Sequence, residues 1–146
     1  MIQGIVQVIA GCIGSLCFGI LFNIKGKKLI FAALGGLLSW GIFLILSCFI
    51  PSEPLNYFIV AMIISVYAEI LARVLKTPTT PIITTSLIPL IPGSALYYTA
   101  SHAFDSDLGA FIEKGVATLK LAAALALGII VVIAAVRITL VGKVKK

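Results

Sequence analysis

Apolar segments of about 20 residues, separated by short polar turns, follow one another along almost the whole chain. A helix of that length crosses the hydrocarbon core of a bilayer, which is about 30 Å thick. The chain is 61% hydrophobic and 11% charged, with a mean hydropathy of +1.22. A soluble globular domain is about 45–50% apolar and about 25% charged. We therefore expect an integral membrane protein built from helices.

The sequence predicts an all-α, polytopic membrane helix bundle that forms a single transmembrane domain over residues 1–146. Its five spans are expected at about residues 2–22, 29–50, 55–75, 82–103 and 116–136. The fourth span is broken: Pro89 and Pro92 each remove a backbone donor, and Gly93 permits a turn that other residues disfavour. Whether residues 82–103 cross fully or form a re-entrant loop stays open at this stage.

The positions of Lys and Arg predict the orientation of the bundle. If the loop Lys25–Lys28 is cytoplasmic and the spans alternate, nine basic residues face the cytoplasm and two, Lys114 and Lys120, face the other side. We therefore expect the N-terminus outside and the C-terminus inside. The net charge of +6 then reflects topology and gives no reason to expect a nucleic-acid partner. The basic tail Gly142–Lys146 is expected to be a stop-transfer anchor, and contact with anionic membrane lipid is the alternative.

Glu69 and Arg73 lie one helical turn apart inside the third span, with Glu first, which is the order that favours pairing. A charge at membrane depth costs roughly 2.5–3.5 kcal/mol on insertion scales, so its default interpretation is functional. Arg73 can extend to the membrane boundary, whereas Glu69 lies about 6 Å deeper. An apolar setting favours the neutral acid and Arg73 favours the carboxylate, a balance that suits a proton carrier. The alternative is an ion pair that locks two helices together.

The broken fourth span is the second candidate site. A helix that restarts after Pro92 and Gly93 would direct free N–H groups and a positive dipole end toward mid-membrane, where they suit a carboxylate. Ser94 would add a hydroxyl group there and Tyr97 an amphipathic ring. The alternative is a proline-kinked helix that only packs.

Small and polar residues recur every fourth position in the first span, which lets two helices approach closely. Most of this pattern indicates packing, and Asn23 and Ser39 are the candidates for facing a polar pathway. The three cysteines lie in apolar runs and are expected to be unpaired packing residues. No catalytic set, phosphate-binding loop or metal-ligand spacing is recognisable, so we expect no enzyme activity, no cofactor and no metal site.

Several motifs between about residues 18 and 100 resemble the small-subunit half of the threonine/serine exporter family, which also includes a two-component bacterial succinate exporter. They are Phe22-Asn23, Gly35–Gly41, Tyr67–Arg73, Lys76–Pro78 and Ile88–Gly93 followed by Tyr97-Tyr98. The resemblance implies a secondary exporter of small amino acids or dicarboxylates in the bacterial inner membrane. It also implies a larger multi-span partner subunit, expected here as a separate polypeptide, while a homo-oligomer stays open.

Two functions follow from these observations. In the first, the chain is a subunit of an exporter driven by the proton motive force, and Glu69 carries the coupling proton. The substrate pathway is then formed by Asn23, Ser39, Arg73, Pro89, Pro92, Gly93, Ser94 and Tyr97. In the second, the chain is a non-conducting subunit that assembles or stabilises a membrane complex.

Overall fold

The computed structural model describes residues 2–104 and 107–144, with side chains described as far as Thr139. All regular structure in these residues is helical: α1 (Ile2–Leu21), α2 (Lys27–Phe49), α3 (Glu53–Val74), α4 (Thr79–Leu87), the 3-10 helix η1 (Ile88–Leu90), α5 (Gly93–Phe104) and α6 (Leu108–Val144). Four of them, α1, α2, α3 and α6, are long and apolar enough to cross a membrane, and α4–η1 with α5 makes a fifth candidate. The predicted all-α bundle is confirmed.

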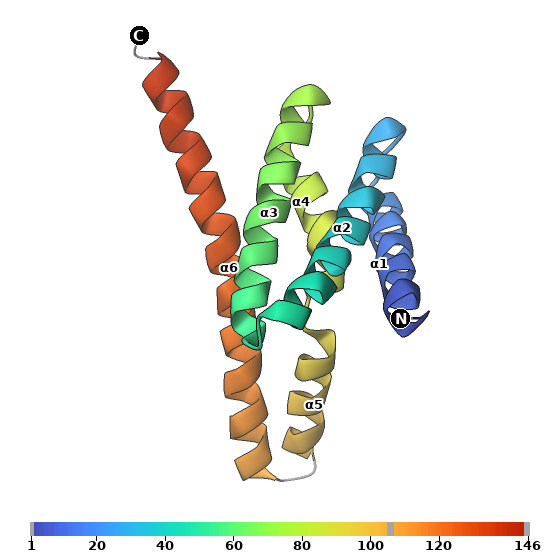
Figure 1. Ribbon diagram of the computed structural model, residues 1–146, viewed down its shortest axis with the longest axis vertical. Coiled ribbons are helices and arrows are strands. Elements are labelled where there is room, and N and C mark those ends of the chain that lie inside the picture. The colour runs from blue at the N-terminus through green and yellow to red at the C-terminus, as the bar shows by residue number, and fades with distance from the viewer. Residues whose placement is uncertain (1, 105–106, 145–146) are drawn as a thin grey trace.

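The helices alternate in direction along the long axis of the molecule (Figure 1). α1 and α3 run toward the end that carries the Lys25–Lys28 loop, and α2 and α4 run away from it. α5 continues in the direction of α4, beyond the turn between α2 and α3, and α6 then runs back along the full length. A re-entrant segment would return to the end where it began, so α4 and α5 have the course of a traverse.

The two chain ends point in opposite directions along this axis, as an odd number of traverses requires (Figure 1). Which end faces the cytoplasm stays a prediction. Of the basic residues used to predict it, Lys145 and Lys146 lie outside the described residues.

The break between α4–η1 and α5 bends the chain by 62°. The chain leaves η1 through Ile91 in an extended conformation, and the Pro92 carbonyl oxygen accepts the Leu96 amide of α5 at 3.0 Å. Gly93 is the first residue of α5 and does not adopt a left-handed backbone, since the described residues with positive φ are Asn23, Gly26 and Lys76. The expectation that Gly93 supplies a special turn is therefore wrong, because the two prolines already end one helix and start the next.

The core of the bundle lies where α2, α3 and α4 meet. Ile64 of α3, Ile82 of α4 and Leu90 of η1 are almost fully enclosed, and the Phe43 ring of α2 packs edge-on against Tyr57 at 5.2 Å between centroids. In lipid, such contacts stabilise the fold through close packing, because lipid chains are as apolar as the side chains that displace them.

α6 contacts α3 through Gly128. A Cβ atom at this position would lie 2.7 Å from both the Ala61 Cβ atom and the Phe58 carbonyl oxygen, so only glycine allows this approach. α6 also begins at Leu108 and ends at Val144, so the helix contains the predicted span 116–136 and extends beyond both of its ends. Glu113 and Lys114 lie in the part of α6 before this span, because charged residues can continue a helix beyond its apolar stretch. At 1.5 Å per residue, α6 is about 55 Å long.

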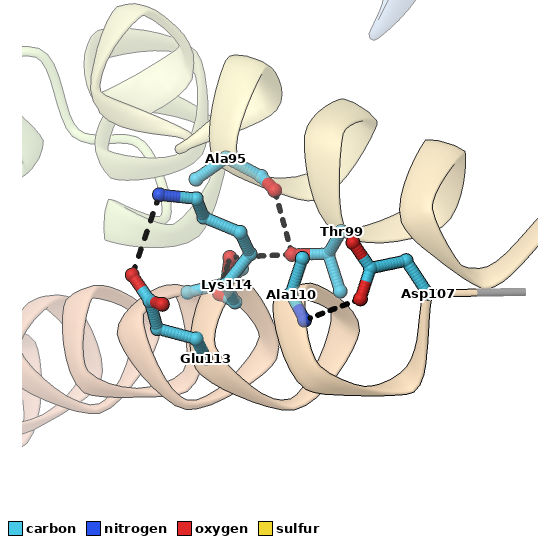
Figure 2. A network of polar contacts seen from close by, with 7 residues as sticks. Ala95, Thr99, Asp107, Ala110, Glu113 and Lys114 are labelled. Atoms are coloured by element: carbon cyan, nitrogen blue, oxygen red, sulfur yellow. Dashed lines mark hydrogen bonds and ion pairs between the residues drawn. The ribbon is translucent and has the colours of Figure 1, made fainter. Parts of the chain in front are cut away.

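α5 and the first half of α6 form an antiparallel hairpin beyond the α2–α3 turn (Figures 1 and 2). The Thr99 and Thr118 hydroxyl oxygens lie 3.1 Å apart, and each lies 2.8 Å from a carbonyl oxygen of its own helix, those of Ala95 and Lys114. Two hydroxyl protons are available for three contacts, so at most two of these contacts are hydrogen bonds at one time. Thr118 is buried at this contact, which fixes the register of the hairpin.

Capping contacts define the start of α6 and the end of α3. The Asp107 carboxylate accepts the Ala110 amide at 3.1 Å and caps the start of α6 (Figure 2). At the end of α3, Lys76 has a φ of 48° and the Thr77 amide donates to the Ala72 carbonyl oxygen at 2.9 Å. This is a Schellman motif, which normally places glycine or asparagine at the position of Lys76.

Candidate functional site

Glu69 and Arg73 form an ion pair on α3, with 3.6 Å between Glu69 Oε2 and Arg73 Nη2. The Glu69 side chain is 15% exposed and that of Arg73 is 53% exposed, so the acid is withdrawn into the bundle while the base reaches outward. A direct charge-assisted hydrogen bond is shorter, at about 2.7–2.9 Å. The contact is therefore an ion pair longer than a direct charge-assisted hydrogen bond.

The start of α5 has the features expected of a carboxylate site. Gly93 and Ser94 are exposed at its first turn, and Pro92 is buried beneath them. The Gly93 amide donates to the Ile91 carbonyl oxygen at 2.6 Å, and helix geometry leaves the amides of Ser94 and Ala95 without an acceptor inside the helix. These amides and the positive end of the α5 dipole can hold an anion.

The structure does not bring the acid and the break together. The break lies beside the turn between α2 and α3, at the lower part of α3 in Figure 1. Glu69 lies about 24 Å along α3 from Glu53, the first residue of that helix. The two candidate sites therefore lie at different levels along α3.

Tyr97 lies on the exposed surface of α5. It is 69% exposed on α5 and stacks edge-on with Tyr98 at 5.6 Å between ring centroids. α5 has no buried residue in this chain, and it packs against α6. The exposed rings therefore belong to a surface that lipid or another chain would cover.

Glycines of α2 allow α1 and α4 to approach from both sides. A methyl group at Gly36 would overlap the Ser15 side chain of α1 and would lie 2.9 Å from the Gly11 carbonyl oxygen. A methyl group at Gly35 would overlap the Ser86 hydroxyl of α4. The small residues of the first span therefore pack against a neighbouring helix, as predicted. We call this contact of Ser15, Gly35, Gly36 and Ser86 the glycine junction.

The glycine junction contains buried hydroxyl groups. The Ser15 and Ser86 hydroxyls are fully buried and have no hydrogen-bond partner among the described residues. An unpaired buried polar group costs about 1–3 kcal/mol, so leaving these hydroxyls unpaired lowers the stability of the fold. Ser39 is also fully buried nearby on α2, but its hydroxyl donates to the Gly36 carbonyl oxygen at 2.9 Å.

Pro89 lines a groove of about 330 Å³ between α1 and η1. Gly11 forms one wall, since a Cβ atom there would lie 3.3 Å from the Pro89 ring. The groove also holds polar groups, because Trp40 Nε1 donates to Gln7 Oε1 at 3.4 Å at its edge. The interruption of the fourth span thus borders an open space rather than a filled one.

Asn23 ends α1. Its φ is 57°, its amide donates to the Ile20 carbonyl oxygen, and the Ile24 amide donates to that of Gly19, both at 2.9 Å. This is a second Schellman motif, and asparagine tolerates the left-handed backbone that it needs. A structural reason therefore accounts for Asn23 without a role in a pathway.

The structure adds residues that the sequence did not single out as pathway residues. Ser15 lies against Gly36 and Ser86 lies against Gly35 of α2, and Gln7 accepts a hydrogen bond from Trp40 at the groove. Ser15 and Gln7 lie on the four-residue repeat of the first span, and Ser86 precedes Pro89 by one helical turn. The sequence pattern contains these positions. Whether they pack against a helix or line a pathway depends on which helix lies beside them, and the sequence does not show that.

The fold and these groups define a polytopic helical membrane protein with a partly exposed ion pair on α3 and two buried hydroxyls that have no partner among the described residues. The chain belongs to the threonine/serine exporter family, because the family model described as "Threonine/Serine exporter, ThrE" matches residues 7–135. This is a family of transporters and not of enzymes, which confirms the resemblance found in the sequence. No curated protein and no solved structure matches the chain.

Proposed function

We propose that this chain is a subunit of a proton-coupled secondary exporter of threonine, serine or small dicarboxylates in the bacterial inner membrane. The observation that carries the proposal is Glu69, a carboxylate that is 15% exposed on an apolar helix and has one loosely held, outward-reaching partner. Membership of an exporter family supports a small amino-acid substrate. In this proposal a larger multi-span subunit supplies the rest of the pathway.

The proposed roles follow from the chemistry of each group. Glu69 binds the coupling proton, and Arg73 holds the carboxylate form and offers a second anchor for an anionic solute. The solute carboxylate binds at the start of α5, at Gly93 and Ser94.

The test is transport in proteoliposomes that contain this chain with its larger subunit. Glu69→Gln is expected to lower efflux driven by a proton gradient at least tenfold while solute exchange at equal pH continues. Glu53→Gln is the matched control, because Glu53 is an exposed acid on the same helix and is expected to change neither rate. Full proton-driven efflux in Glu69→Gln would remove Glu69 from the mechanism.

The second candidate, an assembly subunit, is favoured by one observation. α5 buries none of its residues in this chain, which is what a surface for another subunit looks like. The double substitution Pro92→Ala and Gly93→Leu distinguishes the two functions, and open space around Gly93 leaves room for the new side chain. An intact complex with unchanged transport would favour assembly, and an intact complex with lost transport would favour the pathway.

A further inference from the structure

The connections α1–α2 and α3–α4 lie at the same end of the bundle (Figure 1). Residues 22–28 and 75–81 contain four lysines and no acidic residue. The two connections enclose a pocket of about 280 Å³, which we call the basic pocket. Its walls include Phe22, Lys25, Lys28, Thr77 and Pro81.

The charges around the basic pocket complement an anion. Lys25 is exposed and Lys28 is half-buried, so both ammonium groups can reach a ligand while keeping contact with water. The N-terminus of α4 also lies here, because Thr77 and Pro81 flank its first residue. The C-terminal ends of α1 and α3 carry partial negative charge that would repel an anion. This repulsion is weakened because carbonyl groups at both ends accept hydrogen bonds in the two Schellman motifs.

An apolar groove of about 320 Å³ continues from the basic pocket along α4. Phe22 and Pro81 line both spaces, and Thr80 and Thr84 extend the groove. The Thr84 hydroxyl donates to the Thr80 carbonyl oxygen at 2.8 Å, so its polar group is already occupied and its methyl group remains for contact. The surface thus changes from charged to apolar in the direction of the bilayer interior.

We propose that the basic pocket binds the phosphate headgroup of an anionic phospholipid and that the groove holds one of its acyl chains. Basic pockets between transmembrane helices are suited to anionic headgroups. A free phosphate or a solute carboxylate would use the lysines but would leave the adjoining groove empty. The joined pair of spaces therefore favours a lipid over a small anion, and this inference holds whether or not the chain conducts a solute.

The test measures lipid binding to the purified full chain in detergent. Phosphatidylglycerol is titrated while bound lipid is counted by native mass spectrometry, with phosphatidylcholine, inorganic phosphate, threonine and succinate as competitors. We expect phosphatidylglycerol to bind in preference to phosphatidylcholine. Lys25→Gln with Lys28→Gln is expected to weaken binding about thirtyfold, which corresponds to about 2 kcal/mol for two lysines.

Two further variants separate the headgroup from the acyl chain. Lys27→Gln is the matched charge control, because Lys27 is exposed at the same end but does not line the pocket, and a change below about threefold is expected. Thr84→Phe fills the groove and should weaken binding of the full-length lipid but not of glycerol phosphate. If the double lysine variant does not fold, Lys25→Gln alone is measured, with a smaller loss expected.

Several results would overturn the proposal. Equal binding of phosphatidylcholine would remove the role of the lysines, and an equal loss in Lys27→Gln would reduce the effect to surface charge. Competition by inorganic phosphate at the same affinity would identify a free-anion site. Competition by threonine or succinate would assign the pocket to the transported solute.

Discussion

Replacing Gly36 by alanine should loosen α1 from α2, because the added methyl group has no space at the glycine junction. It would overlap Ser15 and would lie 2.9 Å from the Gly11 carbonyl oxygen, which belongs to a helical backbone and cannot rotate away. Overpacking of this kind costs about 1–3 kcal/mol. Alanine is also a better helix former than glycine by about 1 kcal/mol, which partly hides the steric cost.

Gly41→Ala is the control that isolates the steric effect. Gly41 lies in the same helix, and a Cβ atom there meets nothing within 4 Å. The gain in helix propensity is common to both substitutions, so the two variants should differ by about 1–3 kcal/mol in unfolding free energy. Gly41→Ala should be as stable as the parent chain or more stable.

The assay is reversible unfolding in mixed micelles with increasing dodecyl sulfate, followed by circular dichroism. Adding Ser15→Gly to Gly36→Ala removes the overlapping side chain and should recover part of the lost stability, while the contact with the Gly11 carbonyl oxygen remains. The double-mutant cycle then gives a coupling of about 0.5–3 kcal/mol. Equal stability of the Gly36 and Gly41 variants, or no coupling, would refute the packing described here.

Three further substitutions test local features by the same assay. Asp107→Ala removes the cap of α6 and should lower the unfolding free energy by about 1 kcal/mol, whereas Asp107→Asn should retain most of it; equal losses would argue against the cap. Lys76→Gly relieves a left-handed backbone and should raise stability by about 0.5–1 kcal/mol; a decrease would contradict the Schellman geometry. Ser86→Ala removes an unpaired buried hydroxyl and should raise stability by about 1 kcal/mol; a loss would mean that this hydroxyl has a partner.

The spans could be predicted because the length of an apolar segment and the prolines around it are local properties. The break at Pro89 and Pro92 was found for the same reason, since proline removes a donor wherever it stands. The apolar pattern gave a span at 116–136 but not the start of α6 at Leu108, because a helix can begin outside its apolar stretch.

The candidate site was only partly predictable. The spacing of Glu69 and Arg73 places them on one face of one helix, and the structure has them paired. The contact of Ser15 with Gly36 and of Ser86 with Gly35 depends on how far each helix slides along its neighbour. No single segment contains that information. Asn23 is a different case. The sequence shows a polar residue at the end of a span, and its backbone dihedral angle identifies it as part of a helix cap.

The close approach of α6 to α3 at Gly128 has a mechanical consequence. α6 is unbroken through this point, and Leu108 at its start lies about 30 Å away along the helix. A tilt of about 10° about Gly128 would move Leu108 sideways by about 5 Å, given 1.5 Å of rise per residue. Since α5 packs against this part of α6, a small tilt of α6 about Gly128 would move the whole α5–α6 hairpin.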